Sequence, residues 1–308
     1  MNFSEVISGF SNVSVVSLAM AFILSLVTVI LGSLLFCYFS YALNKRVNFK
    51  DSLKINYISL LTNYMVPFKP GALAVKALLT KIVSGVGVEY ATLIIIMENV
   101  FYYLWQIPLA AALLAFSGMA VLGLKLGWML AIGIFIVLLI VFILHPEGVF
   151  WFRILLPKRI LRRHPGIDDV MGIIKDSRNA FVKPGIIIPL ILISLMLIFI
   201  SPLFVKLAES VITNRISYID AVVIFWISYA AGRLSIIADG FGTKDIAMGG
   251  LLIYYGVGSL DAVKIVVLFR IFTALPVSVI GGCYLITIRK KLSLKQMLSA
   301  KPEKPDKA

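Results

Sequence analysis

Seven basic residues of the 308-residue chain lie inside stretches that are otherwise apolar enough to enter a membrane. Charged side chains at such depth are costly and rare, and they usually face a protein interior or a water-filled cavity. Lysine and arginine are also the side chains that bind phosphate. These residues are therefore candidates for an anion site, and they are Lys69, Lys76, Lys81, Arg233, Lys244, Lys264 and Arg270. For Lys81 and Lys264 we favour a structural interpretation, in which the long side chain extends to the lipid headgroups.

Five of the seven lie in or beside two breaks in the apolar pattern. The first break, Met65–Lys81, reads MVPFKPGALAVKALLTK, and the second, Ile236–Gly250, reads IIADGFGTKDIAMGG. A helix that follows a glycine-bearing loop presents unpaired N–H groups and the positive end of its dipole, which favour an anion. Alternatively, the prolines and glycines only kink buried helices. The predicted phosphate-binding residues are Lys69, Gly71, Lys76, Arg233, Gly240, Gly242 and Lys244.

Acidic residues near these breaks offer partners for the charges. Glu98 and Arg270 occupy nearly equivalent places in the two halves, and we predict an ion pair between them; the alternative is that each pairs locally or faces a wet cavity. Asp239 and Asp245 flank the second glycine loop, where they could close the loop, neutralise Lys244 or carry a coupling proton. No catalytic residue, metal site or cofactor is predicted, because the sequence has no zinc-type ligand spacing, P-loop or serine nucleophile motif.

The elements that must position these residues are membrane helices. The chain is 60% hydrophobic and 14% charged, with a mean hydropathy of +1.00, which excludes a soluble globular domain. We predict an all-α, polytopic integral membrane protein with about seven transmembrane helices and two half-helices or re-entrant segments. The clearest apolar runs are Ser14–Leu43, Thr92–Gly118, Trp128–Leu144, Gly185–Val205, Ala221–Ala238 and Ile265–Ile288.

The net charge of +14 is concentrated in three segments, Asn44–Lys54, Pro146–Lys183 and Thr287–Ala308, which hold 19 of the 29 lysines and arginines. Basic loops of membrane proteins stay in the cytoplasm. We therefore place the N-terminus outside and the C-terminus inside a prokaryotic cell membrane, and expect anionic lipid headgroups as partners, with no nucleic acid.

A weak internal repeat relates the two breaks. A shift of 171 positions brings Gly71 onto Gly242, Gly85 onto Gly256, Gly87 onto Gly258 and Ala91 onto Ala262. We predict a first membrane repeat over residues 13–117 and a second, inverted repeat over residues 184–289. Residues 118–183 form a connecting helix and a basic cytoplasmic amphipathic segment, and residues 290–308 form a basic cytoplasmic tail. Inverted repeats with paired broken helices are typical of secondary transporters, whose substrate site lies between the breaks.

Two motifs carry a family resemblance: NYMVPFKPGALAVK at Asn63–Lys76, and ADGFGTKD at Ala238–Asp245 followed by Arg270. Over roughly Ser14–Arg289 the chain resembles the transmembrane, flippase-like region of the lysylphosphatidylglycerol synthase family, as a stand-alone membrane protein without the synthase domain. The resemblance implies translocation or handling of anionic or modified lipids, such as aminoacylated phospholipids or polyprenyl-phosphate-linked sugars. The chain departs from the family pattern at Ala72, where an acid is frequent, and at Ala238, where the family has proline.

Three hypotheses follow from these observations. The first is a lipid translocase rather than an enzyme. The second is a membrane glycosyl- or phosphotransferase that acts on a polyprenyl-phosphate carrier, with Asp239 or Asp245 as a base or metal ligand. The third is an accessory scaffold that docks a lipid-modifying enzyme through its basic segment.

Overall fold

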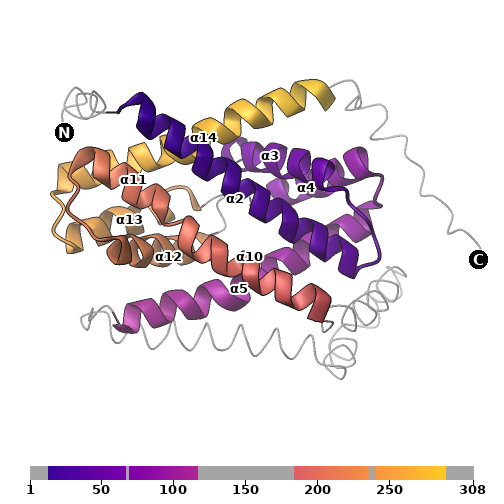
Figure 1. Cartoon of the computed structure of the whole chain (residues 1–308), viewed down its shortest axis with the longest axis horizontal. Coiled ribbons are helices and arrows are strands. Elements are labelled where there is room, and N and C mark those ends of the chain that lie inside the picture. Colours follow the sequence, from indigo (N-terminus) through magenta and orange to yellow (C-terminus); the bar gives the residue numbers. More distant parts are fainter. Residues whose placement is uncertain (1–12, 67–68, 117–183, 236–239, 289–308) are drawn as a thin grey trace, which may run out of the picture.

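The computed structural model describes residues 13–66, 69–116, 184–235 and 240–288, and the regular structure of these residues is entirely helical. In Figure 1 long helices cross the molecule, with α3 and α4 at one end and α11, α12 and α13 at the other. The predicted all-α class is confirmed for the described residues. Their nine helices are α2 (Val15–Ala42), α3 (Phe49–Met65), α4 (Lys69–Ser84), α5 (Val88–Phe116), α10 (Pro184–Ile200), α11 (Leu203–Ile212), α12 (Tyr218–Leu234), α13 (Thr243–Tyr254) and α14 (Ser259–Ile288).

Three helical stretches of the described residues are long and apolar enough to cross a membrane. They are Val15–Ala42, Ile188–Ile212 and Ser259–Ile288, with mean hydropathies of 2.6, 2.7 and 2.1. At about 1.5 Å per residue, each is longer than the ~30 Å hydrocarbon core. The helix predicted at Trp128–Leu144 lies outside the described residues, as do the amphipathic segment and the basic tail, so the number of membrane helices stays a prediction.

The order and the bounds of the helices recur along the chain. We call α2 to α5 the first unit and α10 to α14 the second unit. When the first unit is shifted by 171 positions, each of its helices begins and ends within three residues of its counterpart, with α10 and α11 together standing for α2. The packing recurs as well, because α3 packs on α14 and its counterpart α12 packs on α5.

The turns between the helices also occur as pairs. Asn44 follows α2 with a φ of 54°, and Asn214 follows α11 with a φ of 50°. Gly85 follows α4 with a φ of 75°, and Gly256 follows α13 with a φ of 84°. Asparagine and glycine are the residues that adopt this left-handed conformation most readily. Corresponding helices in the two units are therefore followed by residues with the same left-handed backbone conformation.

The two units share their hydrophobic cores. The first part of α2 packs into the core of the second unit, where Ala21 lies in one cluster with Ile224. The last part of α2 packs into its own unit, where Phe36 lies in one cluster with Ile94; α10 supplies Leu190 to that same cluster. Because each unit completes the core of the other, the two units form one structure around a common centre.

The second unit differs from the first at one break, between α10 and α11. Pro202 has no N–H group, so it cannot bond the carbonyl of Ile198 four residues earlier. The indole Nε1 of Trp226 donates to that carbonyl instead, at 3.0 Å, and the hydroxyl of Tyr218 donates to the carbonyl of Phe199. A helix can be interrupted inside an apolar protein when its freed carbonyl groups find such partners.

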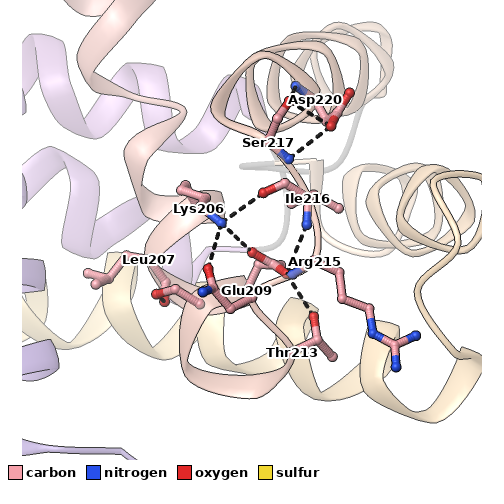
Figure 2. A network of polar contacts seen from close by, with 10 residues as sticks. Lys206, Leu207, Glu209, Thr213, Arg215, Ile216, Ser217 and Asp220 are labelled. Carbon is pink, nitrogen blue, oxygen red and sulfur yellow. Dashed lines mark hydrogen bonds and ion pairs between the residues drawn. The ribbon is translucent and has the colours of Figure 1, made fainter.

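A buried carboxylate fixes the turn that leads from α11 to α12. Figure 2 shows Glu209 at the centre of this turn, with a side chain that is fully buried. It accepts hydrogen bonds from Lys206 Nζ at 2.9 Å, from the Thr213 hydroxyl at 2.7 Å, and from the backbone N–H groups of Arg215 and Ile216. Because charged hydrogen bonds are the strong ones, this network holds the second unit's turn rigidly.

Candidate anion-binding cavity

A cavity of about 300 Å³ with both polar and apolar walls lies where the two units meet, and each of the nine described helices contributes to its lining. Five residues singled out from the sequence line it: Lys76, Glu98, Arg233, Gly240 and Lys244. They come from both units. The described lining residues include three cations and one carboxylate, so positive side chains outnumber negative ones in the described part of the lining.

The first unit contributes a closed ion pair. Lys76 on α4 places its Nζ 2.6 Å from Oε2 of Glu98 on α5, and the two side chains are only 12% and 7% exposed. The Lys76 ammonium also lies 4.8 Å from the centre of the Phe36 ring. The charge of Lys76 is therefore balanced within the protein.

The second unit contributes a lysine that has no acidic partner among the described residues. Lys244 is 5% exposed, and in the described part of the chain its ammonium makes no ion pair and no hydrogen bond. It lies instead among aromatic rings, 4.7 Å from the centre of Tyr229, 4.9 Å from Phe269 and 5.9 Å from Phe225. Aromatic faces attract a cation but do not cancel its charge, so Lys244 presents a net positive charge to the cavity.

Arg233 connects the two units beside Lys244. Its Nη1 donates to Oδ1 of Asn99 at 3.1 Å, from α12 to α5. The guanidinium carbon lies 5.3 Å from the Tyr102 ring and 5.2 Å from the Tyr229 ring. Arg233 is thus held at the cavity wall by groups from both units.

Two glycines allow Lys244 to reach this position. The Gly240 backbone has a φ of 64° and lies so close to Gly232 that a Cβ atom on Gly240 would come within 2.4 Å of the Gly232 Cα. A Cβ atom on Gly232 would come within 3.0 Å of the Lys244 Cβ. The end of α12, the glycine turn and the start of α13 therefore pack with no room for another side chain.

Arg270 and Asp245 form a second ion pair, which does not line the cavity. Nε of Arg270 lies 2.7 Å from Oδ1 of Asp245, and Nη2 donates to Oδ2 at 3.0 Å. Asp245 Oδ2 also accepts the N–H of Gly242 at 2.9 Å, which caps the start of α13. The predicted Glu98–Arg270 pair is wrong, because Glu98 pairs with Lys76 and Arg270 with Asp245. Of the roles suggested for Asp245, the structure agrees with closing the loop, through the N–H of Gly242, and not with neutralising Lys244.

Of the other predicted residues, those whose side chains the structure describes do not line the cavity. Gly71 lies in the first turn of α4 and Gly242 caps α13, but neither lines the cavity. Lys69 begins α4, and Asp239 lies outside the described residues. Lys264 is paired with Asp261 on its own helix at 3.3 Å, away from the lining.

Several lining residues escaped the sequence analysis, although a helical pattern marks them. On α5 the lining includes Glu98, Asn99, Tyr102, Trp105 and Gln106. This spacing of one, four, seven and eight positions from Glu98 places all five on one face of a helix. A polar and aromatic stripe on an apolar helix is therefore the signal for this wall.

The comparisons with known proteins place the chain in a family. No curated protein matches the sequence, and no solved structure matches it. The family model described as the lysylphosphatidylglycerol synthase TM region matches residues 1–281 of the 308-residue chain, which covers the first unit, the second unit except the end of α14, and every described residue that lines the cavity. The chain belongs to the lysylphosphatidylglycerol synthase TM region family of membrane proteins.

Proposed function

We propose that the central cavity binds the phosphate of an anionic lipid, and that the protein moves this lipid across the cell membrane. The observation that carries the proposal is the position of Lys244, a buried ammonium without a carboxylate partner in the described part of the chain. A buried charge that is not paired is strongly unfavourable. A bound anion would supply the missing countercharge.

The neighbouring residues favour a phosphate as this anion. Arg233 presents a guanidinium to the same cavity, and Gly240 brings backbone into the wall at the start of α13. Guanidinium groups and helix N-termini are typical phosphate ligands. The combination supports a phosphate group held mainly by the second unit.

The size of the cavity favours a lipid headgroup. A volume of about 300 Å³ is at the lower end of the range for small-molecule sites. It accommodates a phosphate and a headgroup, but not two acyl chains, which would stay in the surrounding lipid. A lipid translocase requires this arrangement, in which the acyl chains stay in the lipid while the headgroup lies in a cavity of the protein.

The relation between the two units favours translocation over simple binding. We propose that the units are inverted repeats with re-entrant α4 and α13, which are shorter than the long helices at 16 and 12 residues. The matched bounds of the helices and the reciprocal packing of α3 on α14 and α12 on α5 support this relation. Transporters built in this way expose a central site to either side by rocking the repeats. For the transferase alternative, Asp245 is a poor base or metal ligand, because Arg270 and Gly242 occupy both of its oxygens.

A reconstitution experiment tests the proposal. The wild-type protein, Lys244→Met and Lys264→Met are placed in liposomes that contain phosphatidylglycerol with a fluorescent label, and dithionite quenching reports the rate at which lipid crosses. Lys264→Met is the matched control, because Lys264 pairs with Asp261 outside the cavity lining.

We expect Lys244→Met to slow the crossing at least about tenfold, the effect of losing one charged hydrogen bond, and Lys264→Met to keep the wild-type rate. Equal rates for the two variants would contradict the proposal. Formation of a new glycolipid on addition of a sugar donor would support the transferase instead.

A further inference from the structure

We infer that Asn99 is a positioning residue of the anion site, which holds the Arg233 guanidinium at the cavity wall across the contact between the two units. This inference rests on the proposed function, because it assumes that the lipid phosphate binds beside Lys244 and Arg233. It adds a residue of the first unit that touches no phosphate itself and acts through Arg233.

Asn99 occupies an unusual place, the interior of the apolar helix α5. Asparagine is a poor helix former, because its amide competes for hydrogen bonds with the nearby backbone. In this structure the amide has two defined partners: Nδ2 donates to the carbonyl of Ile95 at 2.7 Å, and Oδ1 accepts from Nη1 of Arg233 at 3.1 Å. The bond to Ile95 fixes the amide so that its oxygen is directed at α12.

The chemistry of the two partners explains why the residue is an asparagine. The carbonyl of Ile95 can only accept a hydrogen bond, and the guanidinium of Arg233 can only donate. Position 99 therefore needs a donor and an acceptor side by side, which an amide supplies. An ionised aspartate would lose the bond to Ile95, and leucine would lose both bonds.

A second group of the first unit contacts the same guanidinium. The ring centre of Tyr102, three positions after Asn99 on α5, lies 5.3 Å from the guanidinium carbon of Arg233. Residues three positions apart lie on one face of a helix, and both of these residues line the cavity. An arginine side chain has many rotamers, so contacts that fix it before the ligand arrives reduce the entropy lost on binding. Asn99 thereby raises the affinity of the site for an anion.

The same part of α5 holds a cation of each unit. Glu98 pairs with Lys76 on α4 at 2.6 Å, and the next residue, Asn99, bonds Arg233 on α12. Because α5 and α12 belong to different units, Arg233 is held in this way only while these two helices are in contact. The affinity for the phosphate is therefore tied to the relative position of the two units.

Asn99→Ser is the substitution that isolates the bond to Arg233. A serine in a helix can donate to the carbonyl four residues earlier, as Ser228 does to Ile224 at 2.6 Å. The serine hydroxyl can thus keep the bond to Ile95, but its side chain is too short to bond Arg233.

A double-mutant cycle on the full-length protein tests the inference. Native mass spectrometry measures the dissociation constant of phosphatidylglycerol for the wild type, Asn99→Ser, Arg233→Met and the double variant. We expect Asn99→Ser to bind about three- to tenfold more weakly, the loss of one hydrogen bond. In the Arg233→Met background the same substitution should change binding less than about twofold, because Asn99 acts through Arg233.

Asn56→Ser is the matched control. Asn56 lines the same cavity, but its Nδ2 donates to the hydroxyls of Ser33 and Ser52 within the first unit, at 3.1 and 3.4 Å. Whatever its effect on binding, we expect that effect to be the same with Arg233 and with Arg233→Met. A cycle that is as non-additive at Asn56 as at Asn99 would overturn the inference.

Asn99→Asp separates positioning from simple support of the contact between α5 and α12. Its carboxylate still accepts from Arg233, but it adds a negative charge beside the phosphate. We expect phosphatidylglycerol to bind at least about tenfold more weakly than to the wild type, because of repulsion between like charges, while the melting temperature is no lower than that of Asn99→Ser. Binding that only follows the melting temperature would show a structural role. This variant also tests the inference if Asn99→Ser fails to fold.

The outcomes separate the inference from the proposed function. If Lys244→Met weakens binding but Asn99→Ser and Asn99→Asp bind like the wild type, the inference is overturned and the proposed function stands. An equal loss from Asn99→Ser in both backgrounds also overturns it, since Asn99 then acts without Arg233. If Lys244→Met leaves phosphatidylglycerol binding unchanged, the proposed function itself fails.

Discussion

Each unit places one lysine in the cavity, but the surroundings of the two ammonium groups differ. In the first unit Lys76 is neutralised by Glu98 at 2.6 Å, across the contact between α4 and α5. In the second unit Lys244 lies among aromatic rings, and the acid beside it in sequence, Asp245, is bound to Arg270 between α13 and α14. The same pair of helices therefore carries an ion pair inside the cavity in one unit and outside it in the other. This comparison is the basis of our proposal that the second unit holds the anion, while the first completes the wall.

The largest expected effect comes from breaking the first unit's pair. Lys76→Met leaves the carboxylate of Glu98, whose side chain is 7% exposed, without its partner. Removing one member of a buried pair costs about 3 to 5 kcal/mol, and thermal unfolding of the purified protein in detergent measures the loss. In the double variant Lys76→Met with Glu98→Met, most of the stability should return, because no charge is then buried alone. A double variant as unstable as the single one would show that the loss of stability does not come from breaking the ion pair.

The second-largest effect on stability is expected at the close contact between Gly240 and Gly232, which positions Lys244. Gly240→Ala brings a Cβ atom within 2.4 Å of the Gly232 Cα and places alanine at a φ of 64°. We expect a loss of about 2 to 3 kcal/mol from overpacking and backbone strain, again measured by thermal unfolding. Gly250→Ala is the control, because a Cβ atom there meets nothing within 4 Å. Equal stability of the two variants would contradict the tight packing of α12 on the glycine turn.

The effect on stability should be smaller at the pair of Asp245 and Arg270, which lies outside the cavity lining. Asp245→Asn weakens a pair whose side chains are 14% and 20% exposed. Because such partly exposed pairs are screened by solvent, a loss of about 1 kcal/mol is expected. Lipid binding measured by native mass spectrometry should stay within twofold of the wild type, since neither residue lines the cavity. A large loss of binding would place this pair in the site.

Lys244→Met should have the smallest effect on stability, and its direction is opposite to that of Lys76→Met. No carboxylate partner is left behind in the described part of the chain, and a buried charge is replaced by an apolar side chain of similar length. The melting temperature should stay the same or rise. A fall as large as that of Lys76→Met would mean that Lys244 has a structural role like that of its counterpart.

The helices and the three cations that line the cavity could be identified from the sequence, because both follow from local patterns. Apolar runs and basic residues at the two breaks identify Lys76, Arg233 and Lys244 without knowledge of the fold. The partners could not be predicted, because they depend on how each helix is rotated. Neighbouring residues on a helix point in different directions, so Lys244 faces the cavity while Asp245 faces α14. The stripe of polar and aromatic residues on α5 is visible in the sequence. It did not predict the cavity wall, because an aromatic cluster is equally typical of side chains that only pack against one another.

The binding of phosphatidylglycerol to Lys244→Met tests the central claim most directly. Its dissociation constant is measured for the wild-type protein, for Lys244→Met and for Lys264→Met, in the same detergent and at the same salt concentration. We expect Lys244→Met to bind about 10- to 100-fold more weakly, the range for one charged hydrogen bond, and Lys264→Met to bind like the wild type. Equal dissociation constants for all three proteins would contradict the claim that Lys244 holds the lipid phosphate.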